Sequence, residues 1–326
     1  MTRTTPPRPL DVASVFPELA GMSRTATRLH PRPGEPTVHE SSVGGPLLWP
    51  AGEPWASCSQ EHYAPFGLTT PEEVRTLRRI RALGVWTDED HAEVSRINAG
   101  HDPSLLPEGP HPLVPVAQLY ARDVPDLPFP EGTDLLQVLW CPFIDIVDQS
   151  GSEAVQLHWR RAADVPEAEV LAAAPEPAYV GTYKLVPVPC VLHPEQVLEY
   201  PAAHDLDPGS VGRIRRWNED RGRGMGYQGA LSVAPGWKAG GWAAPFTFRD
   251  SDGPEELRCA RCPAVGEPLL TLDHNEWNPE TESWRPVEEA RGASATPTDV
   301  TVGRGYTLQV YACPADPRHP PVTVMQ

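Results

Sequence analysis

Lysine and long apolar runs are almost absent from this sequence of 326 residues. Lys184 and Lys238 are the two lysines, and 27 Lys and Arg residues face 44 acidic residues, which gives a formal net charge of −17. Binding to a phosphate backbone requires clustered positive charge, so we expect no nucleic-acid partner. A membrane-spanning helix needs about 18 or more consecutive apolar residues, and no run approaches that length, so we expect no membrane span.

Motifs of the common catalytic classes are also missing. The sequence contains no His-Glu-x-x-His pair, no deaminase pattern, no Walker sequence and no nucleophile elbow. The glycines of Gly222-x-Gly224-x-Gly226 follow a predicted helix instead of preceding one, which indicates a loop and not a dinucleotide site. Cys190 lies beside apolar residues and is expected to be a core thiol. These observations favour a non-enzymatic protein, and an enzyme with a site in a cleft between two repeats is kept as an alternative.

The composition is that of a folded chain, with 40% apolar and 22% charged residues. The first ten residues, MTRTTPPRPL, are rich in proline and lack the apolar segment of a secretory signal. They predict a short disordered tail and a cytoplasmic protein. The acidic charge suits either solubility alone or a basic protein partner that is attracted electrostatically.

Frequent prolines and glycines, 41 and 26 in number, predict short strands joined by many loops. Helix signals occur from Thr70-Pro71 to about Ala82, from Asp88 or Asp90 to Ala99, and from Pro208 to about Asp220. Strand-like runs cover residues 113–120, 134–140, 154–159, 191–200, 268–273 and 306–312. The sequence therefore predicts an α+β fold with mainly antiparallel β-sheets and a few peripheral helices.

The most informative feature is an internal repeat. Residues 136–142 read LQVLWCP and residues 308–314 read LQVYACP, so that five of seven positions are identical. Upstream, Gly44-Gly45 is echoed by Gly240-Gly241, and Pro112-Leu113-Val114 by Pro268-Leu269-Leu270, in the same order. Three matches in one order predict an internal duplication, and the two long units are not those of a solenoid array.

The repeat divides the chain into three predicted parts. An N-terminal tail and leading segment covers 1–40, a first repeat with a helical insertion and a connecting segment covers 41–230, and a second repeat covers 231–326. We expect the two repeats to pack as one body.

Four residues of the second repeat have the spacing of a zinc site. Cys259-x2-Cys262 is a tight knuckle whose two sulfurs can reach one ion, while Cys313 ends the last predicted strand and His319 follows six residues later. If the two turns meet at one sheet edge, these donors form a closed tetrahedral site that stabilises the fold. The alternative is a set of buried thiols with an incidental surface histidine.

The duplication predicts a second, weaker site in the first repeat. Cys58-x3-His62 stands where the knuckle is expected, Cys141 matches Cys313, and Asp145 is the nearest candidate for a fourth ligand. A carboxylate is less usual in a structural zinc site, so the alternative is a degenerate site whose residues serve packing. We expect structural zinc, with one ion or two per chain.

Several motifs resemble the YwqG-like family of bacterial proteins of unknown function. They are VGGPLLWP at 43–50, PLVPVAQL at 112–119, LLQV at 135–138, WKAGG at 237–241 and LQV at 308–310. The resemblance extends over about residues 40–315 and implies a duplicated α+β fold rich in antiparallel strands. It implies no particular enzymatic activity.

A more distant similarity is to the programmed-cell-death-protein-two-like proteins, which act as chaperones for a small-subunit ribosomal protein. Shared features are the Gly-Gly start, the cysteines after it and a strand that ends in cysteine, although the zinc-finger insertion of that group is missing here. This similarity implies an acidic chaperone or adaptor for a basic protein partner. YwqG-like proteins also resemble members of toxin-immunity neighbourhoods, which implies an immunity protein that neutralises a toxin as an alternative.

Overall fold

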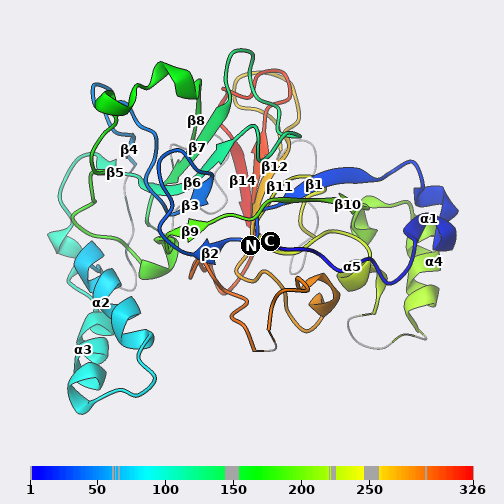
Figure 1. Ribbon diagram of the computed structural model, residues 1–326, viewed down its shortest axis with the longest axis horizontal. Helices are drawn as coiled ribbons and strands as arrows, with labels where there is room; N and C mark the ends of the chain where they lie inside the picture. Colours follow the sequence, from blue (N-terminus) through cyan, green and yellow to red (C-terminus); the bar gives the residue numbers. More distant parts are fainter. Residues whose placement is uncertain are drawn as a thin grey trace.

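Figure 1 shows a computed structural model of the chain, which describes residues 2–60, 62, 64, 67–143, 154–219, 221, 225–245, 257–290 and 292–325. Every strand pair in the described residues is antiparallel, and the pairs form two six-stranded sheets and one short two-stranded sheet. The predicted α+β fold with mainly antiparallel sheets is confirmed. Within the described ranges, no helix is both long and apolar enough to cross a membrane.

The two large sheets have related strand orders. The first has the order β10-β1-β11-β12-β13-β14, formed by Glu195–Glu199, Arg24–Arg28, Lys238–Gly240, Glu267–Leu272, Leu308–Ala312 and Val322–Met325. The second has the order β2-β9-β3-β6-β7-β8, formed by Arg32–Pro33, Cys190–Val191, Ser42–Val43, Val114–Tyr120, Leu135–Trp140 and Val155–Arg160. The short sheet pairs β4, Ser57–Cys58, with β5, His111–Pro112.

The helices lie at the two ends of the long axis, with the sheets between them (Figure 1). One end carries α2, Pro71–Arg81, and α3, Asp88–Ala99, and the other carries α1, Val12–Val15, α4, Pro208–Glu219, and α5, Tyr227–Ala230. Thr70 and Glu73 form a reciprocal capping box that begins α2, which is the start predicted from the sequence. The predicted helices at 88–99 and 208–220 are also confirmed, to within a residue at their ends.

The two strand orders follow the same pattern. In each sheet the first two strands come from the segments 24–33 and 190–199, and the other four strands follow in sequence order, which is the arrangement expected of two equivalent units that exchange their leading strands. The leading segment, residues 24–33, thus contributes β1 to the sheet of the second repeat and β2 to that of the first. Residues 190–199 contribute β9 and β10 in the reciprocal way. The boundaries 1–40, 41–230 and 231–326 remain predictions.

The registers correct one of the three sequence matches. Gln137 pairs with Gln118, and Gln309 pairs with Thr271. In each sheet the register shifts just before this pair, after a proline that lies three residues before the partner of the glutamine: Pro115 before Gln118, and Pro268 before Thr271. Pro268 therefore corresponds to Pro115. The sequence match of Pro268 with Pro112 was wrong. Residues 112–114 and 115–117 are two consecutive runs of proline followed by two apolar residues, and the sequence alone does not distinguish them.

The repeated glutamines explain why the Gly-Gly and LQV motifs recur together. Gln137 donates from Nε2 to the Leu48 carbonyl at 3.0 Å, and Gln309 accepts at Oε1 from the Ala244 amide at 3.2 Å. Both glutamines are fully buried, so these bonds satisfy polar groups that would otherwise be costly in the core. Each glutamine thus fixes the chain four residues after the first glycine of its repeat.

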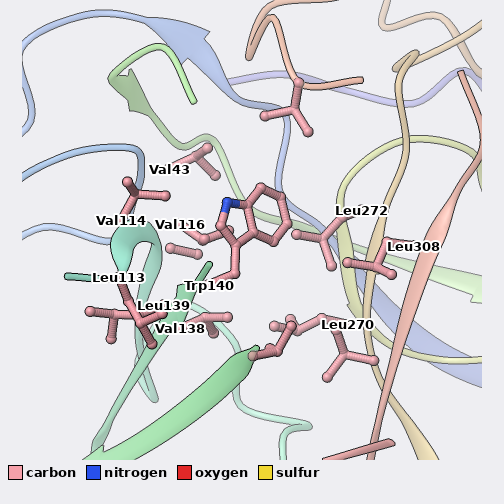
Figure 2. Packing of buried hydrophobic residues seen from close by; sticks show 14 of the residues in the cluster. Val43, Leu113, Val114, Val116, Val138, Leu139, Trp140, Leu270, Leu272 and Leu308 are labelled. Carbon is pink, nitrogen blue, oxygen red and sulfur yellow. The ribbon is translucent and has the colours of Figure 1, made fainter. Parts of the chain in front are cut away.

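A single hydrophobic cluster joins the two repeats. Trp140 is fully buried between Val116 of the first repeat and Leu272 and Leu308 of the second (Figure 2). Its indole Nε1 donates to the Leu185 carbonyl at 2.7 Å, which satisfies the one polar group of the ring. The inner faces of both sheets therefore share one core.

The predicted disordered tail was wrong, since residues 2–10 pack against the second repeat. The Thr4 amide donates to a carboxylate oxygen of Glu288 at 2.8 Å, and the Arg8 guanidinium donates to the Ser283 carbonyl at 2.7 Å. The same guanidinium lies 3.6 Å from the ring centroid of Trp284. Prolines restrict the unfolded backbone, so few specific contacts suffice to order this segment.

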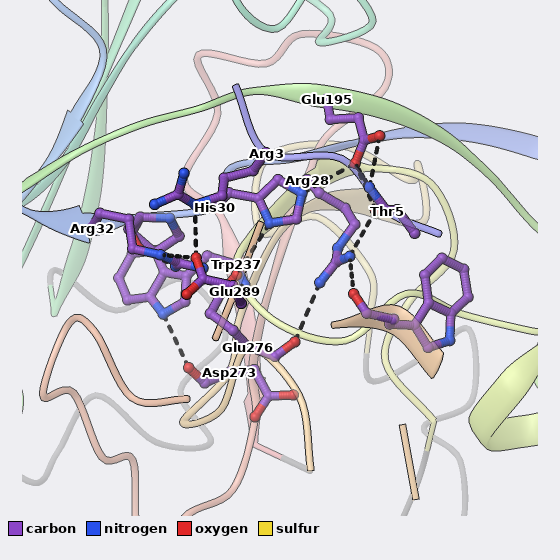
Figure 3. Close-up of polar contacts among 12 residues, drawn as sticks. Arg3, Thr5, Arg28, His30, Arg32, Glu195, Trp237, Asp273, Glu276 and Glu289 are labelled. Carbon is purple, nitrogen blue, oxygen red and sulfur yellow. Dashed lines mark hydrogen bonds and ion pairs between the residues drawn. The ribbon is translucent and has the colours of Figure 1, made fainter. Parts of the chain in front are cut away.

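A buried ionic network lies where β1 continues into β2 (Figure 3). His30, at the bend, has a φ of 43°, and its Nε2 faces the Glu195 carboxylate at 3.2 Å. Arg28 is fully buried and donates to the Trp284 carbonyl at 2.8 Å and the Glu276 carbonyl at 3.2 Å. These contacts tie the exchanged strand to a loop of the second repeat.

Glu276 and His30 form a pair that is best described as neutral. Burial raises the pKa of Glu276 to about 7, against the charges of Arg28 and Arg32, and burial lowers the pKa of His30 to about 4. Glu276 Oε1 accepts from the Trp237 amide at 2.9 Å, and Oε2 lies 3.8 Å from His30 Nδ1. A protonated Oε2 would therefore face an unprotonated ring nitrogen.

Glu276→Gln is expected to gain stability relative to the wild type as the pH rises from 5 to 8. The raised pKa of Glu276 means that its stabilising contribution is fully present below about 4.5 and is lost as the pH rises through about 7, whereas glutamine does not titrate. The relative gain is on the order of 3 kcal/mol in the free energy of unfolding. Urea denaturation of both proteins at pH 5 and pH 8 measures it, and a constant difference would contradict the assignment.

Candidate metal centres

The structure brings together the four residues predicted for the second repeat. One donor atom from each of Cys259, Cys262, Cys313 and His319 lies within 4.8 Å of all the others. Cys259 Sγ is 3.4 Å from His319 Nδ1, and Cys262 Sγ is 3.4 Å from Cys313 Sγ. We call this set the second cluster, and its donors can hold a metal ion.

Two tight turns position the second cluster. The chain reverses between residues 257 and 266, where the Cys259 amide donates to the Ala264 carbonyl at 2.9 Å. The Arg261 amide donates to Cys259 Sγ at 3.3 Å, which is the interaction that stabilises negative charge on a knuckle sulfur. Cys313 follows β13 directly, and His319 comes from the loop between β13 and β14.

Local hydrogen bonds prepare Cys313 for the thiolate form. Burial by itself raises the pKa of its thiol. The hydrogen bond from the Asp316 amide and the contacts with Cys262 and His319 together have the larger effect and lower the pKa to about 6. Because the thiolate is the form that binds metal, the arrangement favours binding at neutral pH.

The first repeat contains an equivalent set of three donors, which we call the first cluster. Atoms of Cys58, His62 and Cys141 lie within 4.8 Å of one another, and Cys141 Sγ is 3.6 Å from the nearest His62 nitrogen. The contact with Cys141 lowers the pKa of Cys58 to about 5 despite the opposing effect of burial, and His62 lowers it further. Asp145, the predicted fourth ligand, lies outside the described residues.

The registers show that the two clusters correspond. In the first repeat Ser57 pairs with Pro112, three residues before Pro115, and in the second Arg258 bridges to Val265, three residues before Pro268. Cys58 and Cys259 each follow the first member of these pairs. The predicted equivalence of the two knuckles is thus visible in the backbone pairing.

One residue beside the first cluster was missed by the sequence. His111 lies directly opposite Cys58 in the β4–β5 pair, is buried, and has its ring centroid 5.0 Å from that of His62. Burial lowers the pKa of His111, and the nearby His62 adds to the effect, so its ring is neutral and able to act as a donor to a metal at neutral pH. The helical insertion separates His111 from the knuckle in the sequence, and only the strand register brings it close.

The remaining cysteine belongs to the core, as the sequence predicted. Cys190 is fully buried, its thiol donates to the Pro297 carbonyl at 3.5 Å, and burial raises its pKa to about 12. It therefore takes no part in either cluster.

The loop of the second cluster also contacts the first repeat. Trp159, on β8, donates from Nε1 to the Pro317 carbonyl at 2.8 Å. Pro317 lies between Cys313 and His319, so whatever orders this loop also supports the outer strand of the other sheet.

The sequence matches no protein-family model, and no curated protein shows significant similarity to it.

Proposed function

We propose that this chain is a non-enzymatic, zinc-stabilised protein-binding protein that acts as a chaperone or adaptor for a basic protein partner. The observation that carries the proposal is the closed donor set of the second cluster, in which Cys259, Cys262, Cys313 and His319 supply all four positions. A catalytic zinc keeps one position for water or substrate, whereas a structural zinc has four protein ligands.

The donor distances fit zinc. Bond lengths of about 2.3 Å to sulfur and about 2.0–2.1 Å to nitrogen place two sulfurs about 3.8 Å apart, and a sulfur and a nitrogen about 3.6 Å apart, on a tetrahedron. The corresponding separations are 3.4 Å for Cys262–Cys313 and 3.4 Å for Cys259–His319. Small movements would bring these atoms to zinc, and thiolate-rich sets favour zinc over harder divalent ions.

His111 is the fourth donor that we propose for the first cluster. It comes from the strand opposite Cys58 and lies beside His62. The three donors of the first cluster lie within 4.8 Å of one another and His111 lies outside that limit, so a movement of its ring would complete a two-cysteine, two-histidine set. That set is a common composition of structural zinc sites. Asp145 is the competing fourth ligand.

The positions of the strongly shifted ionisable groups support a non-catalytic role. Glu276 and His30 are buried in the ionic network where β1 continues into β2, and neither lines any of three prominent cavities among the described residues. Asp273 does line a cavity and burial raises its pKa, but its carboxylate accepts from the Asn275 amide at 3.1 Å in a local turn. An active site would place several such groups around one cavity.

The net charge of −17 and the distant similarity to ribosomal-protein chaperones support a basic partner. In surface plasmon resonance with a panel of purified small-subunit ribosomal proteins, at least one is expected to bind with a Kd below about 1 μM at low salt. Raising the salt to 500 mM should weaken binding at least about tenfold, because steering between exposed charges is screened.

Cytochrome c, a basic protein outside the ribosome, is the control for charge alone. A partner should bind at least about tenfold more tightly than cytochrome c does at equal salt. Equal affinities for cytochrome c and the whole panel, or no binding at all, would contradict the proposal.

A further inference from the structure

The largest of the three described cavities, about 690 Å³, lies between the helical insertion and the second repeat. Its walls come from three segments far apart in the sequence: α2 and α3, the segment 181–185, and the turn 301–305. An ion pair between Arg78 Nε and Asp299 at 3.2 Å and a hydrogen bond from the Thr301 amide to the Lys184 carbonyl at 2.9 Å hold these walls together. Its volume falls within the range of about 300–1,000 Å³ typical of small-molecule sites.

The charge of this cavity is opposite to that of the chain. None of its fifteen lining residues is acidic. Aspartate and glutamate make up 44 of the 326 residues, so fifteen residues of average composition would include about two. Lys184 and Arg304 both line it, and neither forms an ion pair with any residue in the described part of the chain. Lys238, the other lysine, is buried against Glu199, so Lys184 is the lysine left for a ligand.

Neutral polar groups and apolar side chains complete the walls. His274 donates from Nδ1 to the Val300 carbonyl at 3.0 Å, which fixes its ring at the wall. Gly305 has a φ of +96°, a backbone conformation that favours glycine, and it lets the turn 301–305 pass beside the His274 ring. The other lining residues include the hydroxyls of Thr69, Thr182 and Thr301 and the apolar side chains of Leu77, Ile97, Leu185 and Val302.

We propose that this cavity binds a small organic anion, with Lys184 and Arg304 contacting its carboxylate or phosphate groups and the apolar wall contacting its carbon skeleton. Arginine and lysine are the side chains that recognise both kinds of anionic group. The threonine hydroxyls supply further donors at the same wall. The site is independent of both metal clusters and of the proposed protein partner.

Isothermal titration calorimetry at constant ionic strength with citrate and with phenyl phosphate tests the proposal. The wild type is expected to bind at least one probe with a Kd below about 1 mM. Binding of citrate alone would assign a carboxylate ligand, and binding of phenyl phosphate alone a phosphate ester, and either supports the proposal. The absence of measurable binding of both probes up to 10 mM, about ten times that Kd, would overturn it.

Two double variants with the same change in net charge separate the cavity from charge in general. Lys184→Gln with Arg304→Gln removes both cavity cations, and Arg79→Gln with Arg215→Gln removes two exposed arginines that do not line it. The cavity variant is expected to weaken binding at least about tenfold and the control variant less than about twofold. Equal weakening by both would overturn the proposal, and circular dichroism checks that each variant is folded.

Discussion

Cys259→Ser is expected to lose one zinc ion per chain and to lower Tm by on the order of 10 °C. Cys259 supplies one of the four donors, and Cys313, whose pKa is lowered to about 6, would be left among donors that no longer enclose an ion. The loss should extend to the first repeat, because the loop from Cys313 to His319 also accepts the hydrogen bond of Trp159. Mass spectrometry of untagged protein gives the metal content, and calorimetry gives Tm.

Cys190→Ser is the matched control, since Cys190 is buried outside both clusters and should keep its metal content unchanged. One ion retained in Cys259→Ser would support a metal in the first cluster. His111→Ala should then lose that ion, while Asp145→Asn should keep it. The reverse pattern would assign the fourth position to Asp145, and wild-type protein without zinc would refute the metal proposal at both clusters.

Lys238→Met is expected to cost about 3–5 kcal/mol in the free energy of unfolding, because it leaves a buried carboxylate without its counter-charge. Lys238 and Glu199 are both fully buried, and Lys238 Nζ lies 2.8 and 2.7 Å from the two carboxylate oxygens. Glu199 also accepts from the amides of Ala234 and Trp242, each at 2.9 Å. These contacts connect β10, β11 and the Gly-Gly turn of the second repeat, so the damage should be global.

The pH dependence of this variant distinguishes an unpaired charge from a simple packing defect. Without Lys238, Glu199 would be buried without a counter-charge, and burying an unpaired carboxylate costs more than burying the neutral acid. The cost in urea denaturation should therefore be smaller at pH 5 than at pH 8. Lys184, the other lysine, is half-buried and forms no ion pair with the described residues. The control variant Lys184→Met should therefore cost less than about 1 kcal/mol in the free energy of unfolding. A pH-independent cost would favour a packing defect.

The sequence predicted most of the inner strands but missed β1. The strands β6, β7, β12 and β13 are formed by short, mainly apolar runs bounded by turns. Runs of this kind are typical of buried strands and can be recognised in the sequence. The segment RTATR of β1 has a polar pattern, yet Arg28 is fully buried. Its burial is possible because Thr5 and two backbone carbonyls accept its hydrogen bonds, and partners so far along the chain leave no local signal.

The sequence identified residues that lie together in space where the donors share one tight turn. The Cys259 knuckle occupies one tight turn, so two residues of separation define its geometry. His111, by contrast, is placed opposite Cys58 by strand pairing after an insertion of two helices. Finding it requires the register between β4 and β5, which a single sequence does not contain.

The exchange of leading strands has a consequence for synthesis on the ribosome. β1 ends at Arg28, but its partner β10 begins at Glu195, 167 residues later (195 − 28), and β11 follows at Lys238. At about 5–20 residues per second, the edges of β1 would stay unpaired for on the order of 10 s. Every strand of the first repeat's sheet has been made once Val191 is added, whereas β1 belongs to the other sheet and waits for β10 and β11. During that interval the two unpaired edges of β1 are exposed to strand pairing with neighbouring chains.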